Sequence, residues 1–263
     1  MKKAVSMLLA VTLIFLLAAC GSSKESKMKA SSTEGEEKKV LTMGTSSDYP
    51  PFEFVDTAKS DEIIGFDIDL AKLVAGELGY EVEVKDIDFN GLIPALQANQ
   101  IDFVMAGMTP TDDRKKSVDF SDVYYTARHM IVSQKKSKMK SESSLKGKTV
   151  GVQLASIQED KAKELAKLLD LKIETRNRIP ELIQELKSGR VDAVIIEDTV
   201  ANGYFKKNPD LYGAAIKGND EEAGSAIAFP KNSELTKEFN SVLKEKLSNG
   251  EVDKLVVKWF GGK

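Results

Sequence analysis

The sequence predicts an α/β protein built from two similar lobes, which two crossover strands join and between which a ligand cleft lies. From Val40 onward, short apolar runs of the kind found in strands alternate with helical patterns. A second series of the same kind begins near Lys148. Strands that alternate with helices favour mainly parallel sheets covered on both faces, so each series indicates one lobe. A helix–turn–strand unit that occurs once in each series supports the division into two.

In the first series, the sequence favours strands over 40–44, 81–84 and 101–106 and helices over 70–78 and 92–98. The strands are read from apolar runs or strict alternation, and the helices from apolar residues three and four positions apart. Gly79 follows the first helix, as is typical of a helix C-terminus. Pro94 is expected in the first turn of the second helix, where a missing N–H breaks no hydrogen bond.

In the second series, the sequence favours strands over 149–152, 172–175 and 191–196 and helices over 157–169 and 180–187. Pro180 is expected to begin the last of these helices, and Gly189 to follow its end. A strand over 227–229 and two amphipathic helices then close the chain. We therefore place the first lobe at 40–126 and 225–263 and the second lobe at 127–224.

The two series correspond at an offset of 90 residues. Leu92, Leu96 and Asp102 match Leu182, Leu186 and Asp192. An ordinary α/β unit gives a similar apolar pattern, so a true repeat and a coincidence both stay open. In open α/β sheets, ligands bind outside the carboxyl ends of the strands. That rule predicts that four loops line one cleft, namely 45–49, 106–111, 153–158 and 197–199.

Composition narrows the possible functions. The chain has 263 residues, of which 41% are hydrophobic and 30% charged, so it can bury a core. Its net charge of −3 gives no bulk basicity, and we expect no nucleic-acid partner. A single cysteine and a single histidine, His129, exclude a disulfide framework and a metal centre built from several such residues. We expect no cofactor, and for His129 a hinge or surface role.

The N-terminus has the features of a processing signal. Lys2 and Lys3 precede an apolar stretch, too short for a comfortable membrane span, that ends in small residues directly before Cys20. This arrangement resembles a bacterial lipobox, which implies cleavage of residues 1–19 and a diacylglyceryl group on Cys20. An ordinary signal peptide with an incidental cysteine is the alternative. Residues 20–39 are polar and charged, as is typical of a flexible tether. We expect a lipid-anchored protein on the extracytoplasmic face of the cell membrane.

Several runs together resemble a known family. They are YPPFE at 49–53, GFDIDLAKLV at 65–74, LIPALQANQID at 92–102, AGMTPTDDR at 106–114, VDFSDVYY at 118–125, LKGKTVGVQ at 145–153 and AGSAIAFPK at 223–231. These runs look like those of polar amino-acid-binding proteins of ABC transporters, which have the type II periplasmic-binding-protein fold. The nearest in appearance are arginine- or lysine-binding lipoproteins of Gram-positive bacteria. The resemblance implies a non-enzymatic monomer that captures a basic amino acid, arginine first and then lysine or histidine, and delivers it to a membrane permease.

The resemblance also implies a set of site residues. Arg114 ends the AGMTPTDDR run, and its planar guanidinium matches a ligand α-carboxylate, with help from Gly107, Met108 and Thr109. Thr111 is expected to cap the short helix that carries Arg114. Asp198, which follows a strand, is assigned to the α-ammonium group.

For the ligand side chain, the resemblance places Tyr49 and Phe89 as aromatic walls, which suit a cation over a ring face. The candidates for the distal charge are polar residues of the loops, namely Asp48, Gln153, Ser156, Gln158 and Glu197. Family members often have an aspartate where this chain has Ser46, so the terminal contact is left open.

Three other functions remain as alternatives. One is binding of glutamine or another polar amino acid, one is a cyclohexadienyl-dehydratase-like enzyme on the same fold, and one is a sensory module. Asp67 and Asp69 form a pair of carboxylates in the GFDIDL run. We interpret them as helix-cap and surface groups rather than as catalytic groups.

Overall fold

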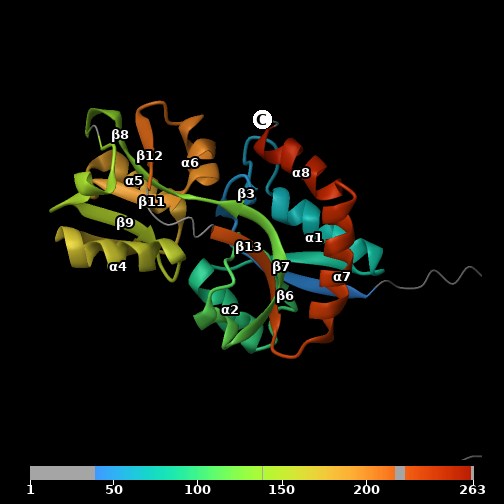
Figure 1. The fold of residues 1–263 in the computed structure, drawn as a ribbon. Helices are drawn as coiled ribbons and strands as arrows, with labels where there is room; N and C mark the ends of the chain where they lie inside the picture. The colour runs from blue at the N-terminus through green and yellow to red at the C-terminus, as the bar shows by residue number, and fades with distance from the viewer. Residues whose placement is uncertain (1–38, 138, 217–222, 262–263) are drawn as a thin grey trace, which may run out of the picture. The chain divides into compact units, whose positions relative to one another are not determined.

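The computed structural model describes residues 39–137, 139–216 and 223–261, and two five-stranded sheets carry the fold (Figure 1). The first sheet has the order β5 (Glu81–Asp86), β1 (Val40–Thr45), β6 (Phe103–Val104), β13 (Ala223–Pro230) and β7 (Val118–Ala127). The second has the order β10 (Lys172–Arg176), β9 (Thr149–Gln153), β11 (Ala193–Glu197), β8 (His129–Gln134) and β12 (Leu211–Ala215). A small third sheet contains β2 (Asp48–Tyr49), β3 (Glu53–Val55) and β4 (Ile63–Ile64).

The α/β class is confirmed, but the two large sheets are mixed rather than mainly parallel. In the first, β1 pairs in parallel with β5 and β6. In the second, β9 pairs in parallel with β10 and β11. The strands β13 and β8 each pair antiparallel with two neighbours. These antiparallel pairs arise because the chain leaves the first sheet along β7, enters the second along β8 and returns in β13.

The helices are α1 (Phe66–Glu77), α2 (Phe89–Gln97), α3 (Asp112–Lys115), α4 (Ile157–Leu169), α5 (Ile179–Ser188), α6 (Asp198–Phe205), α7 (Glu234–Ser248) and α8 (Glu251–Phe260), with 3-10 turns η1 (Lys135–Ser137) and η2 (Glu142–Leu145). We call the first sheet, the small sheet and α1, α2, α3, α7 and α8 the first lobe. The second sheet with α4, α5 and α6 is the second lobe.

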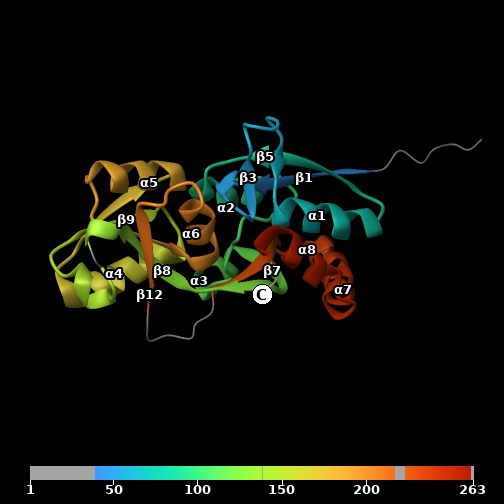
Figure 2. The ribbon, with the colours of Figure 1, turned by 90° about the horizontal axis from the view of Figure 1, so that it is seen from above.

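Different helices cover the two faces of each large sheet, because successive side chains of a strand point to opposite faces. Phe103 packs against Phe239 of α7, whereas the next residue, Val104, belongs to the cluster formed with Leu92 of α2. Figure 1 accordingly shows α1, α7 and α8 together on one side of the first sheet and α2 on the other. In the second lobe, α4 and α5 lie on opposite sides of β9 (Figure 2).

The repeat at an offset of 90 residues is present in the structure. The helices α2 and α5 begin at Phe89 and Ile179, and both precede the third parallel strand of their sheet. The Asp102 carboxylate accepts from the amide of Thr42 at 2.7 Å, and the Asp192 carboxylate accepts from the amide of Thr149 at 2.9 Å. Each aspartate therefore joins the turn after the helix to a parallel strand of its sheet, β1 in the first lobe and β9 in the second.

Two local predictions were wrong. Pro94 lies inside α2 rather than in its first turn, because the helix begins at Phe89. Asp67 is neither a cap nor a surface group: it is fully buried in α1, where its carboxylate accepts from the Gly107 amide and the Tyr124 hydroxyl, both at 2.9 Å. Its neighbour Asp69 accepts from the Trp259 indole at 2.7 Å. The apolar periodicity of the run predicted the helix but carried no signal of these partners.

Among the residues that the structure describes, none of the helices combines the length and the apolar character needed to cross a membrane. The apolar N-terminal stretch and Cys20 lie outside the described residues, so the processing signal stays a prediction.

Candidate functional site

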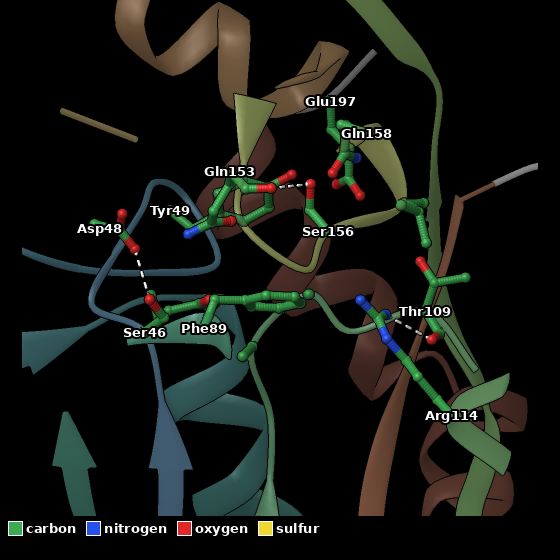
Figure 3. Close-up of a pocket in the computed structure, with 14 residues that line it drawn as sticks. Ser46, Asp48, Tyr49, Phe89, Thr109, Arg114, Gln153, Ser156, Gln158 and Glu197 are labelled. Carbon is green, nitrogen blue, oxygen red and sulfur yellow. Dashed lines mark hydrogen bonds between the residues drawn. The ribbon is translucent and has the colours of Figure 1, made fainter. Parts of the chain in front are cut away.

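The carboxyl ends of β1, β6, β9 and β11, with the loops that follow them, line one pocket (Figure 3). The residues that line it are Ser46, Asp48, Tyr49, Glu53, Phe89, Ala106, Gly107, Thr109, Arg114, Gln153, Ser156, Ile157, Gln158 and Glu197. All four loops that the strand-end rule selected contribute to this lining.

Arg114 enters the pocket from the short helix α3. Thr111 caps that helix, as predicted, and its hydroxyl accepts from the Arg114 amide at 3.3 Å. The guanidinium donates to the carbonyl oxygens of Thr109 at 2.8 Å and of Ala155 at 2.9 Å. Burial lowers the pKa of Arg114 to about 10, which leaves it charged at neutral pH. Because a guanidinium has five N–H donors, three remain for a ligand.

The two predicted aromatic walls both line the pocket. The Arg114 guanidinium lies over the Phe89 ring, 5.2 Å from its centre (Figure 3). The Tyr49 ring stacks on Phe52 with a centre-to-centre distance of 5.7 Å. Gly107 has a φ of +56°, and a Cβ built there would lie 3.2 Å from the Tyr49 ring. A glycine at this position therefore lets the loop after β6 approach Tyr49 closely.

Asp48 is nearly buried and already has partners. Its carboxylate accepts from the Ser46 hydroxyl at 2.9 Å and from the Ile179 amide of the second lobe at 2.6 Å. Burial raises the pKa of Asp48 to about 6, while its hydrogen bonds to Ile179 and Ser46 act in the opposite direction. The structure thus brings Ser46 and Asp48 to the pocket but binds the carboxylate of Asp48 to the protein itself.

Glu197 is only 2% exposed, and its Oε2 atom has no hydrogen-bond partner among the described residues. Burial, reinforced by repulsion from Asp198, raises the pKa of Glu197 to about 8. Figure 3 shows the Glu197 and Gln158 side chains close together at one side of the pocket. A carboxyl group in this position is well placed to meet a cation brought by a ligand.

Ser156 and Gln153 organise the second-lobe side of the pocket. The Ser156 hydroxyl donates to the Gln153 carbonyl at 2.7 Å and accepts from the Glu159 amide at 3.2 Å, which caps α4. The Gln153 side chain donates to the Asn177 carbonyl at 3.0 Å. The N-terminus of α4, with Ile157 and Gln158, therefore faces the pocket. The first amides of a helix lack intrahelical partners and favour negative charge.

Glu53 is a lining residue that the sequence analysis did not select. It is fully buried, and both of its carboxyl oxygens lack a hydrogen-bond partner among the described residues. Burial raises the pKa of Glu53 well above its usual range, and repulsion from Asp67 adds to the shift. Burial likewise raises the pKa of Asp67 to about 6. Ala106 and Ile157 are the other lining residues that were missed, and small or apolar residues give no chemical signal in a sequence.

Two residues selected from the sequence, Met108 and Asp198, lie outside the pocket lining. A third selected group, the Gly107 amide, already has a hydrogen-bond partner. Asp198 is the first residue of α6, and its carboxylate accepts from the amides of Arg128 at 3.2 Å and Thr199 at 2.8 Å. Met108 is buried in the apolar cluster under α2. The Gly107 amide, expected to face a ligand carboxylate, instead donates to Asp67. Glu197 is the last residue of β11 and lines the pocket, whereas Asp198 is already in α6 and binds two amides beside it.

Comparison with known proteins defines the class of this chain. Residues 41–262 match the family described as bacterial extracellular solute-binding proteins, family 3. The chain belongs to this family, which confirms the resemblance and the type II periplasmic-binding-protein fold.

Relatives and solved structures agree with that assignment. The chain is 57% identical to the arginine-binding extracellular protein ArtP of Bacillus subtilis (strain 168), over 100% of this chain and 99% of that protein. A solved ancestral arginine-binding protein bound to arginine has a TM-score of 0.79 and 45% identity, covering 84% of this chain and 98% of the other. A structure of an ancestral arginine-binding protein bound to glutamine has a TM-score of 0.78 and 44% identity, covering 85% and 98%.

Proposed function

We propose that this solute-binding protein captures L-arginine between its lobes, accepts lysine and histidine more weakly, and delivers the ligand to the permease of an ABC transporter. The observation that carries the proposal is the charge of the pocket. Its lining holds three carboxyl groups, those of Asp48, Glu53 and Glu197, against the single guanidinium of Arg114. Arginine brings two cations and one anion, so it complements this excess of acid.

The α-carboxylate of the ligand would bind between Arg114 and the N-terminus of α4. The Arg114 guanidinium touches the Ala155 carbonyl directly before that helix, so the two anion-binding groups are adjacent. A planar guanidinium and free helix amides both favour a carboxylate. The same arrangement would draw the two lobes together, because Arg114 belongs to the first lobe and α4 to the second.

The two cations of the ligand would meet the acidic side of the pocket. Asp198 remains our proposal for the α-ammonium group, although its carboxylate is now bound to two amides. Glu197 is the competing candidate, because it is buried in the pocket and has an oxygen without a partner among the described residues. Tyr49 and Phe89 would hold the aliphatic stem, and Glu53 or Gln158 would lie near the distal group.

Glutamine binding is the main alternative, and the glutamine-bound ancestral structure gives it weight. The acidic lining argues against it, because a cationic side chain can displace the proton of a buried carboxyl group and pair with it, whereas a neutral side chain gains no ion pair. A cyclohexadienyl-dehydratase-like enzyme is the second alternative. The family to which the chain belongs is described by solute binding and not by catalysis. The test is to incubate the protein with a cyclohexadienyl acid. Formation of a reaction product would show that the protein is an enzyme.

We further propose that the mature protein begins at Cys20, carries a diacylglyceryl anchor there and works as a monomer on the outer face of the cell membrane. This proposal rests on the N-terminal sequence pattern. Residues 20–39 would act as the tether. We also propose that residues 40–126 and 225–263 form the first lobe and residues 127–224 the second.

Truncated ligands test the assignment of the two ends of the amino acid. Agmatine lacks the α-carboxylate and 5-guanidinovalerate lacks the α-amino group. We expect Arg114→Ala to weaken arginine by about 2–5 kcal/mol, the cost of leaving a buried charge without its partner, but to change agmatine little. Asp198→Asn should weaken arginine but not 5-guanidinovalerate. Equal losses for full and truncated ligands in calorimetry would contradict the assignments, and Glu197→Gln serves as the parallel variant for the competing candidate.

A further inference from the structure

At the edge of the pocket, one cluster of polar residues joins the two lobes, and it shares Asp48 with the pocket lining. We call this cluster the latch, and it consists of Asp48, Asp86 and Asp88 in the first lobe and Asn177, Arg178 and Ile179 in the second. Arg178 donates to both oxygens of Asp86, at 2.9 and 3.2 Å, and from Nε to Asp88 at 2.5 Å. Asn177 donates to Asp88 at 2.9 Å, and the Ile179 amide donates to Asp48 at 2.6 Å.

The latch forms where two helix N-termini meet. Asp88 is the N-cap residue of α2 and Arg178 is the N-cap residue of α5, so equivalent positions of the internal repeat contact each other. The N-terminus of a helix carries partial positive charge, and two such ends repel. Asp48, Asp86 and Asp88 supply negative charge between them. The acidic residues thus make the approach of the two helices favourable, and Arg178 ties them together.

The contacts of Arg178 in the latch have a more specific geometry than an ordinary surface ion pair. Arg178 contacts Asp86 through two parallel hydrogen bonds, an arrangement that is charge-assisted and geometrically specific. The Arg178 side chain is 23% exposed, whereas that of Arg190 is 62% exposed. Arg190 pairs with Glu185, and both of these residues belong to the second lobe. Partial burial acts to raise the pKa of Asp86, but the bonds to Arg178 outweigh it and lower that pKa.

We propose that Arg178 is a positioning residue for ligand binding: it locks the closed lobes together without touching the ligand and so sets how long the ligand stays bound. Every side-chain donor of the latch belongs to the second lobe and every carboxylate to the first, so opening the lobes breaks all of its bonds at once. A contact made only in the closed state shifts the open–closed equilibrium and raises the apparent affinity for any ligand held inside. The inference rests on solute capture by lobe closure and not on arginine as the solute.

The test compares Arg178→Gln with Arg190→Gln, an arginine of the same lobe whose ion pair does not reach the first lobe. We expect Arg178→Gln to raise the Kd for arginine about 5- to 30-fold, mainly through faster dissociation, and Arg190→Gln to leave it within about 2-fold. Arg178→Lys should recover part of the loss. The wild-type Kd should also rise between about 50 and 500 mM salt more steeply than that of Arg178→Gln, since salt screens exposed ion pairs.

A double-mutant cycle with Asp86→Asn separates the latch from a general structural role. In arginine binding, we expect the loss of affinity in the double variant Arg178→Gln/Asp86→Asn to differ from the sum of the two single losses. In the unfolding of the ligand-free protein, we expect the two changes in free energy to add. Coupling of equal size in both measurements, or an unchanged Kd in Arg178→Gln, would overturn the proposal. If the wild type bound none of arginine, lysine, histidine and glutamine, the proposed function would fail. The latch would then be tested by titrating the remaining amino acids and repeating the comparison of Arg178→Gln with Arg190→Gln on the one that binds; an equal Kd for the two variants would overturn it.

Discussion

At the scale of single residues, burial controls the charge of the pocket. The carboxyl group of Glu197 has a pKa of about 8 without a ligand, so it holds a proton at neutral pH. A cation placed beside it lowers that pKa and expels the proton. We therefore expect arginine binding near pH 7 to release a proton and to tighten as the pH rises toward 8.

Calorimetry in two buffers of different ionisation enthalpy measures this release. Glu197→Gln should abolish it, whereas Asp198→Asn should only reduce it, because repulsion from Asp198 contributes to the raised pKa of Glu197. The same number of protons released by the wild type and by Glu197→Gln would show that another group supplies the proton, with Glu53 as the next candidate.

Asp67 gives a prediction about stability instead of binding. Its pKa is about 6 in the folded protein and 3.8 in the reference state. Folding therefore favours the protonated form, and the stabilisation present below about pH 4 is lost as the pH rises toward 6, by on the order of 3 kcal/mol. Asp67→Asn keeps an oxygen for Gly107 and Tyr124, so it should fold and show a flatter dependence of unfolding free energy on pH. Urea unfolding at several pH values checks this, and an unchanged slope would count against it.

At the scale of elements, the internal repeat makes a paired prediction. Asp102 and Asp192 bind a strand amide in the same manner, Asp102 in β1 and Asp192 in β9. Removing either carboxylate leaves a backbone amide without its partner, which costs about 1–3 kcal/mol when the amide is buried. Asp102→Ala and Asp192→Ala should therefore lower the free energy of unfolding by similar amounts. A large effect in one lobe and none in the other would show that the shared geometry has no shared energetic role.

The elements also show what a sequence can predict. The helix over 157–169 was predicted with the bounds of α4, because a capping serine, an apolar stripe and the residue Asp170 mark its ends. The four pocket loops followed from the rule about strand ends. The start of α2 and the antiparallel pairing of β8 and β13 could not be predicted in this way, since helix starts and strand directions depend on tertiary contacts.

Arg114, Tyr49 and Phe89 were predicted from the resemblance to the family, and all three line the pocket. Asp67 and Glu53 were missed because nothing in a periodic apolar run shows that a carboxyl group will be buried beside a pocket. Asp198 was assigned to the α-ammonium group from its place after a strand, and Glu197 was only a candidate for the distal charge. Of the two, Glu197 lines the pocket. The latch was missed for a further reason: its partners lie about 90 positions apart, and only the closed arrangement of the lobes brings them together.

At the scale of the whole molecule, the first prediction concerns the anchor. Cys20→Ser should abolish labelling by a radioactive fatty acid and release the protein from the membrane, because the proposed acyl chains provide the attachment. The variant should bind ligand as the wild type does, which serves as the control for folding. Retention on the membrane without the cysteine would contradict the lipid anchor.

Ligand selectivity is the most direct test of the central claim that the acidic pocket holds a basic amino acid. The measurement is calorimetric titration of the wild-type protein with arginine, lysine, histidine and glutamine at one salt concentration and neutral pH. We predict that arginine binds tightest, because its guanidinium can stack on a ring and donate in its own plane. It should exceed glutamine by at least about 30-fold, since only a cationic side chain can displace the proton of a buried carboxyl group and pair with it. Glutamine binding more tightly than both arginine and lysine would contradict the claim.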